Sequence, residues 1–157
     1  MTSTNMGRRY IEEALGRTDP VRLAHERGRW STVVREAQEA VELLLLLKGA
    51  LRLVAVEPAR THDPAELLRR EAARFPDWMR HEIDHLAAIS TEMAGDRGLA
   101  FYGDERQALG PQELFDESDG SRAVGNLEYV AKLVTRLLAE HGSTPPPSAP
   151  SSDVNAD

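Results

Sequence analysis

Residues 30–54, WSTVVREAQEAVELLLLLKGALRLV, decide the fold of this chain. Apolar residues recur in this stretch at the spacing of an α-helix, and they form a stripe that covers more than ~100° of the helix surface. The stripe comprises Val33, Ala37, Ala40, Val41, Leu44, Leu47 and Leu51. This pattern predicts a long helix that packs one side against its own domain.

Two further leucines of this helix, Leu43 and Leu46, project outside the stripe, among charged residues that should face solvent. Those charged residues are Arg35, Glu36, Glu39 and Glu42. The two leucines need either another element of the same chain or a second copy of the chain to cover them. A chain of 157 residues has few helices with which to wrap one helix completely. We therefore expect a homodimer whose interface includes Leu43, Leu46 and Leu47.

The length and composition exclude several classes of protein. A chain of 157 residues is expected to form one domain with a core that needs no cross-links. It has no cysteine, which excludes disulfides, thiolate catalysis and cysteine-bound zinc. No apolar stretch reaches the ~18 residues of a membrane span, and the N-terminus lacks the apolar core of a signal peptide, so we expect a soluble, cytoplasmic protein without a membrane partner. The net charge of −7 disfavours non-specific attraction to nucleic acid, which would have to bind at a local patch.

The remaining chain is also helical in pattern, and this predicts an all-α fold. The expected helices are residues 10–28 with a break at the Asp19-Pro20 step, 30–54, 64–74, 77–95 and about 119–141. The glycine-rich residues 95–118 are expected to form a long loop. We expect a helical domain over residues 1–141 and a disordered tail rich in proline and serine over residues 142–157.

Residues 81–85, HEIDH, match the H-E-x-x-H sequence of zinc proteases. Histidines four residues apart share one face of a helix and can bind one zinc ion, while Glu82 would activate a bound water. The apolar residues of this helix, however, direct the polar ones toward solvent, namely His81, Glu82, Asp84 and His85. We therefore predict an exposed polar face with no bound metal. A zinc hydrolase that uses His81, Glu82 and His85 is a remote alternative.

Two other polar segments would form a site if the helices brought them together. Residues 61–63, Thr-His-Asp, put His62 near the start of the third helix, where Asp63 is expected to be the cap. Residues 96–104, DRGLAFYGD, carry three side chains suited to a ligand: Arg97, Tyr102 and Asp104. A plain helix cap and an ordinary surface turn are the alternative explanations of these two segments.

In order and spacing, these features resemble the HEPN domain family. The second helix of that family reads approximately A-x-Q-x-A-x-E-K-A-L-K-A-L, and residues 37–47, AQEAVELLLLL, occupy that place here. The family's H-D step before its third helix is matched by His62 and Asp63. Its R…Y-(P/G)-D ending is matched by Arg97, Tyr102, Gly103 and Asp104. The resemblance covers about residues 8–140.

The resemblance implies an up-and-down bundle of four to five helices that forms a homodimer. Members of the family occur as small stand-alone proteins, as partners of minimal nucleotidyltransferases and as toxin ribonucleases. By analogy, we expect a module that binds a nucleotide or nucleic acid without a cofactor, or that partners a minimal nucleotidyltransferase, in a toxin–antitoxin or stress and defence setting. The ligand-binding residues expected on this basis are Arg97, Tyr102, Asp104, His62, Asp63 and Glu42.

The ribonuclease members use R-x(4–6)-H, in which the arginine stabilises the cleaved phosphate and the histidine assists proton transfer. Here Arg97 is followed at those offsets by Tyr102, Gly103 and Asp104. Binding without efficient catalysis is therefore the expectation. The alternative is a metal-independent ribonuclease toxin in which Arg97 acts with Tyr102, with Asp104 as a further catalytic candidate. A second departure is that leucines replace lysines of the family's second helix, at Leu43 and Leu46.

Overall fold

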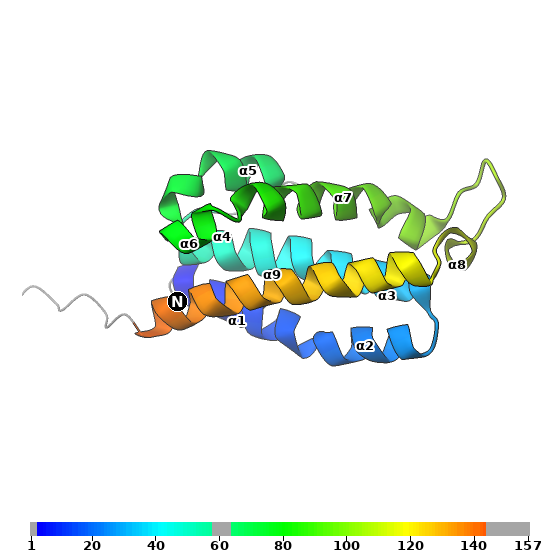
Figure 1. Ribbon diagram of the computed structural model, residues 1–157, viewed down its shortest axis with the longest axis horizontal. Helices are drawn as coiled ribbons and strands as arrows, with labels where there is room; N and C mark the ends of the chain where they lie inside the picture. The colour runs from blue at the N-terminus through cyan, green and yellow to red at the C-terminus, as the bar shows by residue number, and fades with distance from the viewer. Residues whose placement is uncertain (1–2, 58–63, 144–157) are drawn as a thin grey trace, which may run out of the picture.

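The computed structural model describes residues 3–57 and 64–143, and the regular structure in these ranges is helical (Figure 1). The elements are α1 (Ser3–Gly16), α2 (Thr18–Glu26), α3 (Trp30–Glu39), the π-helical η1 (Ala40–Ala50), α4 (Leu51–Leu53), α5 (Ala65–Arg70), the 3₁₀ turn η2 (Ala72–Arg74), α6 (Asp77–Arg80), α7 (Ile83–Tyr102), α8 (Pro111–Leu114) and α9 (Glu117–Ser143). The all-α prediction is confirmed. Among the described helices, none is both long enough and apolar enough to cross a membrane.

The bundle is built around one central rod. α3, η1 and α4 follow one another without a break, where residues 30–54 predicted a single helix. α1 packs on η1, α9 packs on both α3 and η1, and α7 packs on α3. Figure 1 shows α5 and α6 beside the start of α7, and α8 beyond its end. Four rods, α1–α2, α3–α4, α7 and α9, therefore share the core, as expected for a helical bundle.

The first rod bends near the predicted place. α1 ends at Gly16 and α2 begins at Thr18, so the bend lies at Arg17, close to the Asp19-Pro20 step. Pro20 lies in the first turn of α2, where a missing backbone N–H breaks no hydrogen bond within the helix. The predicted break in this helix is confirmed.

Of the two alternatives for Leu46, cover by the same chain is the one that the structure shows, and the α-helical projection that set this residue among charged ones is wrong. In η1 the N–H of Leu51 donates to the carbonyl of Leu46, a bond across five residues rather than four. A π-helical segment holds more residues per turn than an α-helix, so an α-helical projection misplaces the side chains along it. Leu46 and Leu47 are buried within the chain, and Leu43 is half-buried against the same core. Leu46 and Leu47 therefore have almost no surface left for a second copy, while the homodimer and the role of Leu43 in it stay predictions.

The prediction of a loop from residue 95 is also wrong, because α7 continues to Tyr102. Gly95 and Gly98 lie on the outer side of the helix, where a Cβ would meet open space. A glycine costs only ~1 kcal/mol inside a helix, and burial of Met93 and Ala100 holds the last turns against the bundle. The loop is therefore confined to the stretch after Tyr102, apart from the short helix α8.

The third and last expected helices differ from the sequence-based prediction in their bounds. The expected helix 64–74 is divided into α5 and η2. α9 begins at Glu117, slightly before the expected start, and it is capped reciprocally: the N–H of Asp116 donates to Asp119 and the N–H of Asp119 donates to Asp116, both at 3.0 Å. The hydrogen bond from the backbone of Asp119 lowers the pKa of Asp116. His62, Asp63 and the tail from residue 144 lie outside the described residues.

Candidate functional site

The largest cavity that involves predicted site residues lies between the central rod and the end of α7. It has a volume of about 280 Å³. Its lining comprises Gln38, Glu39, Glu42, Leu43, Arg97 and Phe101. The structure thus brings together two predicted ligand residues, Glu42 and Arg97, and one predicted interface residue, Leu43.

The deep side of this cavity is polar although it is buried. Gln38 and Glu42 are only 2% and 4% exposed. The side-chain amide of Gln38 donates a short hydrogen bond to the carboxylate of Glu42, one turn further along the rod. Burial of a carboxylate is unfavourable unless it receives such bonds. The expectation that Glu42 lies on a solvent-facing side is wrong, because the extra turns of α7 cover this side of the rod.

A second carboxylate of the lining, Glu39, is paired from outside the cavity. Nη1 of Arg17, at the bend between α1 and α2, lies 3.0 Å from Oε1 of Glu39. Arg17 also pairs with Glu13 at 3.0 Å. Burial by itself would lower the pKa of Arg17, but the hydrogen bonds to Glu39 and Glu13 outweigh it and raise that pKa. Glu39 therefore has a cationic partner within the protein.

Two arginines lie close to the ring of Phe101, which lines the cavity together with Arg97. The guanidinium carbon of Arg35, on α3, lies 5.3 Å from the ring centroid of Phe101, and that of Arg97 lies 5.7 Å from it. Both distances are within the range of cation–π attraction. Arg35 also pairs with Glu36 at 3.6 Å. Among the described residues, no carboxylate forms an ion pair with Arg97, which lines the cavity.

The surface beyond the mouth is apolar and exposed. Tyr102 is 80% exposed and Phe101 is 41% exposed, and Leu99 is similarly accessible. Arg97, Phe101 and Tyr102, with Gly98, also line a smaller hollow of about 50 Å³. Exposed apolar groups gathered at one place indicate a contact with a ligand or a partner. Tyr102 therefore belongs to the rim of the site, not to its interior.

Asp104 shapes the loop and does not line either cavity. Its Oδ1 accepts hydrogen bonds from the N–H groups of Arg106 and Gln107, and its backbone forms an antiparallel bridge with Leu109. Gly103 precedes it with φ +74° and ψ −164°, a conformation that is essentially restricted to glycine. A Cβ at Gly103 would overlap the carbonyl oxygen of Leu109. Of the predicted ligand residues in this segment, Asp104 is thus the one whose contacts are structural.

The H-E-x-x-H segment lies at the other end of α7 and is used in packing. His81 lies in the turn between α6 and α7, so it does not share a regular helix with His85. Glu82 is half-buried and accepts a short hydrogen bond from the hydroxyl of Tyr129 on α9, which corrects the expectation that Glu82 faces solvent. The rings of His85 and Tyr129 are 4.7 Å apart. Burial, followed by the hydrogen bond to Glu82, raises the pKa of Tyr129.

No group of three or more histidine, aspartate or glutamate side chains within residues 3–57 and 64–143 is arranged to hold a metal ion. Among the described residues, the H-E-x-x-H segment therefore has no third side chain placed to bind a metal ion with its histidines. The absence of bound zinc stays a prediction, for which elemental analysis is the test.

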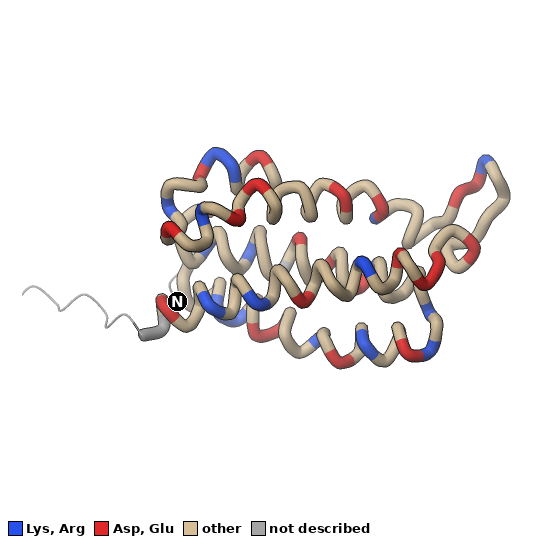
Figure 2. Tube along the Cα trace, viewed as in Figure 1, with Lys and Arg blue, Asp and Glu red and all other residues tan. Residues whose placement is uncertain are grey.

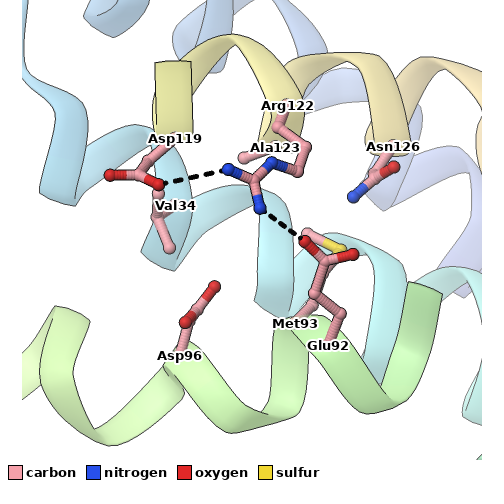
Figure 3. A pocket seen from close by; sticks show the side chains of 8 residues that line it. All are labelled: Val34, Glu92, Met93, Asp96, Asp119, Arg122, Ala123 and Asn126. Carbon is pink, nitrogen blue, oxygen red and sulfur yellow. Dashed lines mark hydrogen bonds and ion pairs between the residues drawn. The ribbon is translucent and has the colours of Figure 1, made fainter. Parts of the chain in front are cut away.

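A third hollow, of about 20 Å³, lies between α7 and α9 and is drawn in Figure 3. Arg122 reaches from α9 across it, with Nη1 3.0 Å from Glu92 and Nη2 3.5 Å from Asp119. Asp96 points into the same hollow (Figure 3). Burial, and then the charges of Glu92 and Asp119, raise the pKa of Asp96. This hollow has room for little more than a water molecule, so we interpret it as a polar contact between two helices.

Sequence reasoning missed Arg35, Gln38 and Phe101 as residues of the site. A signal was present for the first two, because Arg35, Gln38, Glu39 and Glu42 follow the i, i+3, i+4, i+7 spacing of one helix face. Phe101 is four residues after Arg97, which places both on one side of α7 once that helix is known to continue. Because Gly95 and Gly98 suggested a loop, there was no reason in the sequence to place Arg97 and Phe101 on one helix face.

Comparison with known families gives one match. The family model of the HEPN domain matches residues 8–137. The comparison with curated proteins and the comparison with solved structures each found no match to the chain. The matched range covers most of the chain, from α1 to the last turns of α9, and it includes all of the residues that line the cavity at Arg97. The chain therefore belongs to the HEPN domain family.

Proposed function

We propose that this protein is a binding module for a phosphate-bearing nucleotide ligand, held in the cavity between α3–η1 and the end of α7. The observation that carries the proposal is that Arg97 and Phe101 line a cavity of about 280 Å³ and that the guanidinium groups of Arg35 and Arg97 both lie within 6 Å of the Phe101 ring centroid. Guanidinium forks match phosphate oxygens. The exposed ring offers a face on which a base stacks.

The charge distribution supports a local site over a broad nucleic-acid surface. The chain carries a net charge of −7. Figure 2 shows acidic and basic residues interspersed along the helices in that view. Affinity for a long polyanion depends on many phosphate contacts, whereas a nucleotide needs only a few well-placed ones. A small ligand therefore fits this surface better than a duplex.

The ribonuclease alternative, in which Arg97 acts with Tyr102, is less well supported. No histidine of the described residues lines either cavity that Arg97 lines. The hydroxyl of a tyrosine has an ordinary pKa near 10, which makes it a poor general base at neutral pH. We therefore place binding ahead of catalysis.

The R-x(4–6)-H spacing also occurs at Arg74 and His81, at Arg80 and His85, and at Arg136 and His141, so it is not specific to one site of the chain. Arg136 and His141 have this spacing on α9. The guanidinium of Arg136 lies 4.0 Å from the ring centroid of Trp78 and its Nε lies 3.4 Å from Glu140. His141 instead lines an open hollow beside Arg74. The spacing alone is therefore a weak indicator of ribonuclease activity in this arginine-rich chain.

The exposed surface at Tyr102 supports a role alongside another protein. A partner nucleotidyltransferase in a toxin–antitoxin or defence setting, or a second copy of this chain, would cover Leu99, Phe101 and Tyr102, which are the exposed apolar groups at this end. Such a cover would also close the mouth of the cavity over a bound nucleotide. This part of the proposal follows the family resemblance, and the accessible side of Leu43 lies in the lining of the same cavity.

The test compares Arg97→Ala with Arg106→Ala by calorimetric titration against a panel of nucleoside monophosphates. Arg106 is an exposed arginine of the loop after α7 that lines neither cavity, so it controls for the change in net charge. Loss of a charge-assisted hydrogen bond is worth ~1.5–3 kcal/mol, so Arg97→Ala should weaken binding by about 10- to 100-fold. The Arg106→Ala variant should bind like wild type.

The same preparations should leave a mixed RNA substrate intact. Cleavage by wild type that disappears in both Arg97→Ala and Tyr102→Phe would establish the ribonuclease alternative. If wild type binds no nucleotide, the proposal fails and a purely partner-holding role takes its place.

A further inference from the structure

We propose that Lys48 and Arg52 form a second anion site, which binds a terminal phosphate group on the surface between the central rod and α1. Neither residue lines the cavity at Arg97, so the site is separate from that cavity and does not depend on the proposed function. The inference follows from the aromatic ring that the two cations share, from their lack of a carboxylate partner among the described residues and from the close packing of α1 on the rod.

Both cations lie near one aromatic ring. Nζ of Lys48, in η1, is 4.7 Å from the ring centroid of Tyr10, and the guanidinium carbon of Arg52, in α4, is 5.7 Å from the same centroid. Tyr10 belongs to α1, which packs along η1 and α4. All three residues are half-buried, so part of each stays accessible to solvent. Two positive charges are thus gathered at one accessible place.

The two cations are not neutralised by the part of the chain that the structure describes. Among residues 3–57 and 64–143, no carboxylate forms an ion pair with Lys48 or Arg52. Glu13 on α1 and Glu39 on the rod both pair instead with Arg17. Like charges that stand one helical turn apart repel each other. An anion that contacts both cations would replace this repulsion with attraction.

The packing of α1 holds the stem of Arg52 in place. α1 approaches the rod so closely at Gly7 that a Cβ there would lie 3.1 Å from the carbonyl oxygen of Gly49 and 3.2 Å from Cβ of Arg52. Nε of Arg52 is buried and has no hydrogen-bond partner among the described residues. The guanidinium group therefore has fewer positions open to it than that of a free surface arginine, and binding a ligand costs less conformational entropy.

A terminal phosphate matches this pair of cations better than a carboxylate does. A guanidinium group binds phosphate oxygens through two parallel N–H donors, and an ammonium group binds phosphate as a point charge. A phosphate monoester carries about −1.5 to −2 charges at pH 7 and has three strong acceptor oxygens, so it can pair with both cations at once. A carboxylate carries a single charge on two oxygens. The charge of the site thus favours a phosphate monoester or free phosphate.

The first test uses unmodified protein, because the chain has only two lysines, Lys48 and Lys132. Lys132 is exposed on α9 and serves as the internal control. Acetylation with a limiting amount of an N-hydroxysuccinimide ester, followed by mass spectrometry, gives the reaction rate of each lysine. Relative to sodium chloride at the same ionic strength, inorganic phosphate should slow the acetylation of Lys48 and leave that of Lys132 unchanged. Equal effects on the two lysines, or no effect on Lys48, would refute the site.

The second test removes the other cation. Arg52→Gln keeps the Cβ and Cγ atoms of the stem and breaks no hydrogen bond of Nε with the described residues. Loss of a charge-assisted hydrogen bond should raise the phosphate concentration that half-protects Lys48 by about 10-fold or more. Arg8→Gln, at an exposed position of α1, controls for the loss of one positive charge and should leave that concentration unchanged. Equal effects of the two variants would contradict the site, and the first test decides the proposal even if Arg52→Gln does not fold.

The same measurement identifies the source of the phosphate and separates the two sites. Arg97→Ala should leave the protection of Lys48 by inorganic phosphate unchanged, so a failure of binding at Arg97 and a failure at Lys48 are different results. A short single-stranded RNA with a 5′-phosphate is compared with the same RNA with a 5′-hydroxyl. Stronger protection by the phosphorylated RNA than by inorganic phosphate at equal concentration indicates the end of an RNA strand, and the reverse indicates a free phosphate. Equal protection by the two RNAs would show that backbone diesters suffice, which would overturn the terminal-phosphate assignment.

Discussion

The two ends of α7 differ in the sequence motifs that they match and in the contacts that their side chains make. Residues 81–85, at the start of α7, match the H-E-x-x-H sequence of zinc proteases completely. Arg97 and Tyr102, near its end, match only part of the ribonuclease motif. At the start, Glu82 and His85 contact Tyr129 and join α7 to α9. At the end, Arg97 and Phe101 line a cavity.

The difference teaches that a motif predicts chemistry only where its side chains converge on a space that a ligand can enter. The histidines at the start lie on an irregular turn and on the helix that follows, and the glutamate between them is engaged by a tyrosine. The end of α7 has no complete motif. It does have an arginine without a carboxylate partner among the described residues, an exposed ring and a buried polar pair, all directed at one cavity.

The largest expected effect concerns the end of α7, where Gly103→Ala should destabilise the fold. Any Cβ would overlap the carbonyl of Leu109, and the backbone conformation of Gly103 is disfavoured for alanine. We expect a loss of ~2–3 kcal/mol in the free energy of unfolding, measured by urea denaturation, together with weaker nucleotide binding. The control is Gly95→Ala on the same helix, which should be neutral or stabilising by up to ~1 kcal/mol because its Cβ meets open space. Equal stability of the two variants would show that the loop tolerates another conformation.

A smaller effect is expected at the start of α7, where Tyr129→Phe removes the hydrogen bond to Glu82. The loss should be ~1 kcal/mol in the free energy of unfolding, with no change in nucleotide affinity. Tyr102→Phe, at the exposed end, should leave the stability unchanged.

The contribution of Tyr129 should also depend on pH. Because its pKa is raised in the folded protein, folding favours the protonated phenol, and the resulting stability is present below pH ~10 and is lost as the pH rises through the folded pKa. The difference between wild type and Tyr129→Phe should therefore shrink above pH ~10. A difference that grows with pH in that range would contradict this assignment.

The sequence predicted much of the fold because burial follows helical periodicity. The central rod, the bend near Pro20 and the helical character of the whole chain all followed from apolar spacing and proline position. The placement of Leu46 failed because the projection assumed the α-helical number of residues per turn, whereas η1 is wound more loosely. The placement of Glu42 failed because α7 continues further than the sequence indicated. No residue in AVELLLLLKGA indicates that the helix changes there from α-helical to π-helical winding.

The candidate site could be predicted only in part. Arg97 and Glu42 were identified through the family resemblance, and the structure places both in one cavity. Phe101 was missed because two exposed glycines suggested that the helix had already ended. Asp104 was predicted to bind a ligand, but its carboxylate accepts hydrogen bonds from backbone N–H groups of its own loop. That role depends on the conformation of residues 104–109, which the residue type alone does not reveal.

The smallest expected effect lies midway along α7, where Asp96→Asn should stabilise the protein slightly at neutral pH. Burial, and then the charges of Glu92 and Asp119, raise the pKa of Asp96 in the folded state. Folding therefore favours the protonated carboxyl, whose stabilising contribution is complete below pH ~3.9 and is lost as the pH rises through the folded pKa. At pH 7 the charged Asp96 is unfavourable, and asparagine removes that charge.

The gain should remain below ~1 kcal/mol because solvent screens a partly exposed carboxylate, and thermal unfolding is sensitive enough to detect it. The pH provides the internal control. The difference between Asp96→Asn and wild type should vanish near pH 3, where the wild-type carboxyl is itself protonated. Destabilisation at pH 7 would mean instead that Asp96 contributes a favourable contact to Arg122, which stands opposite it in the same hollow (Figure 3). The carboxylate in the middle of α7 would then join two helices, as Glu82 does at the start of α7. It would differ from the end of α7, which lines a cavity.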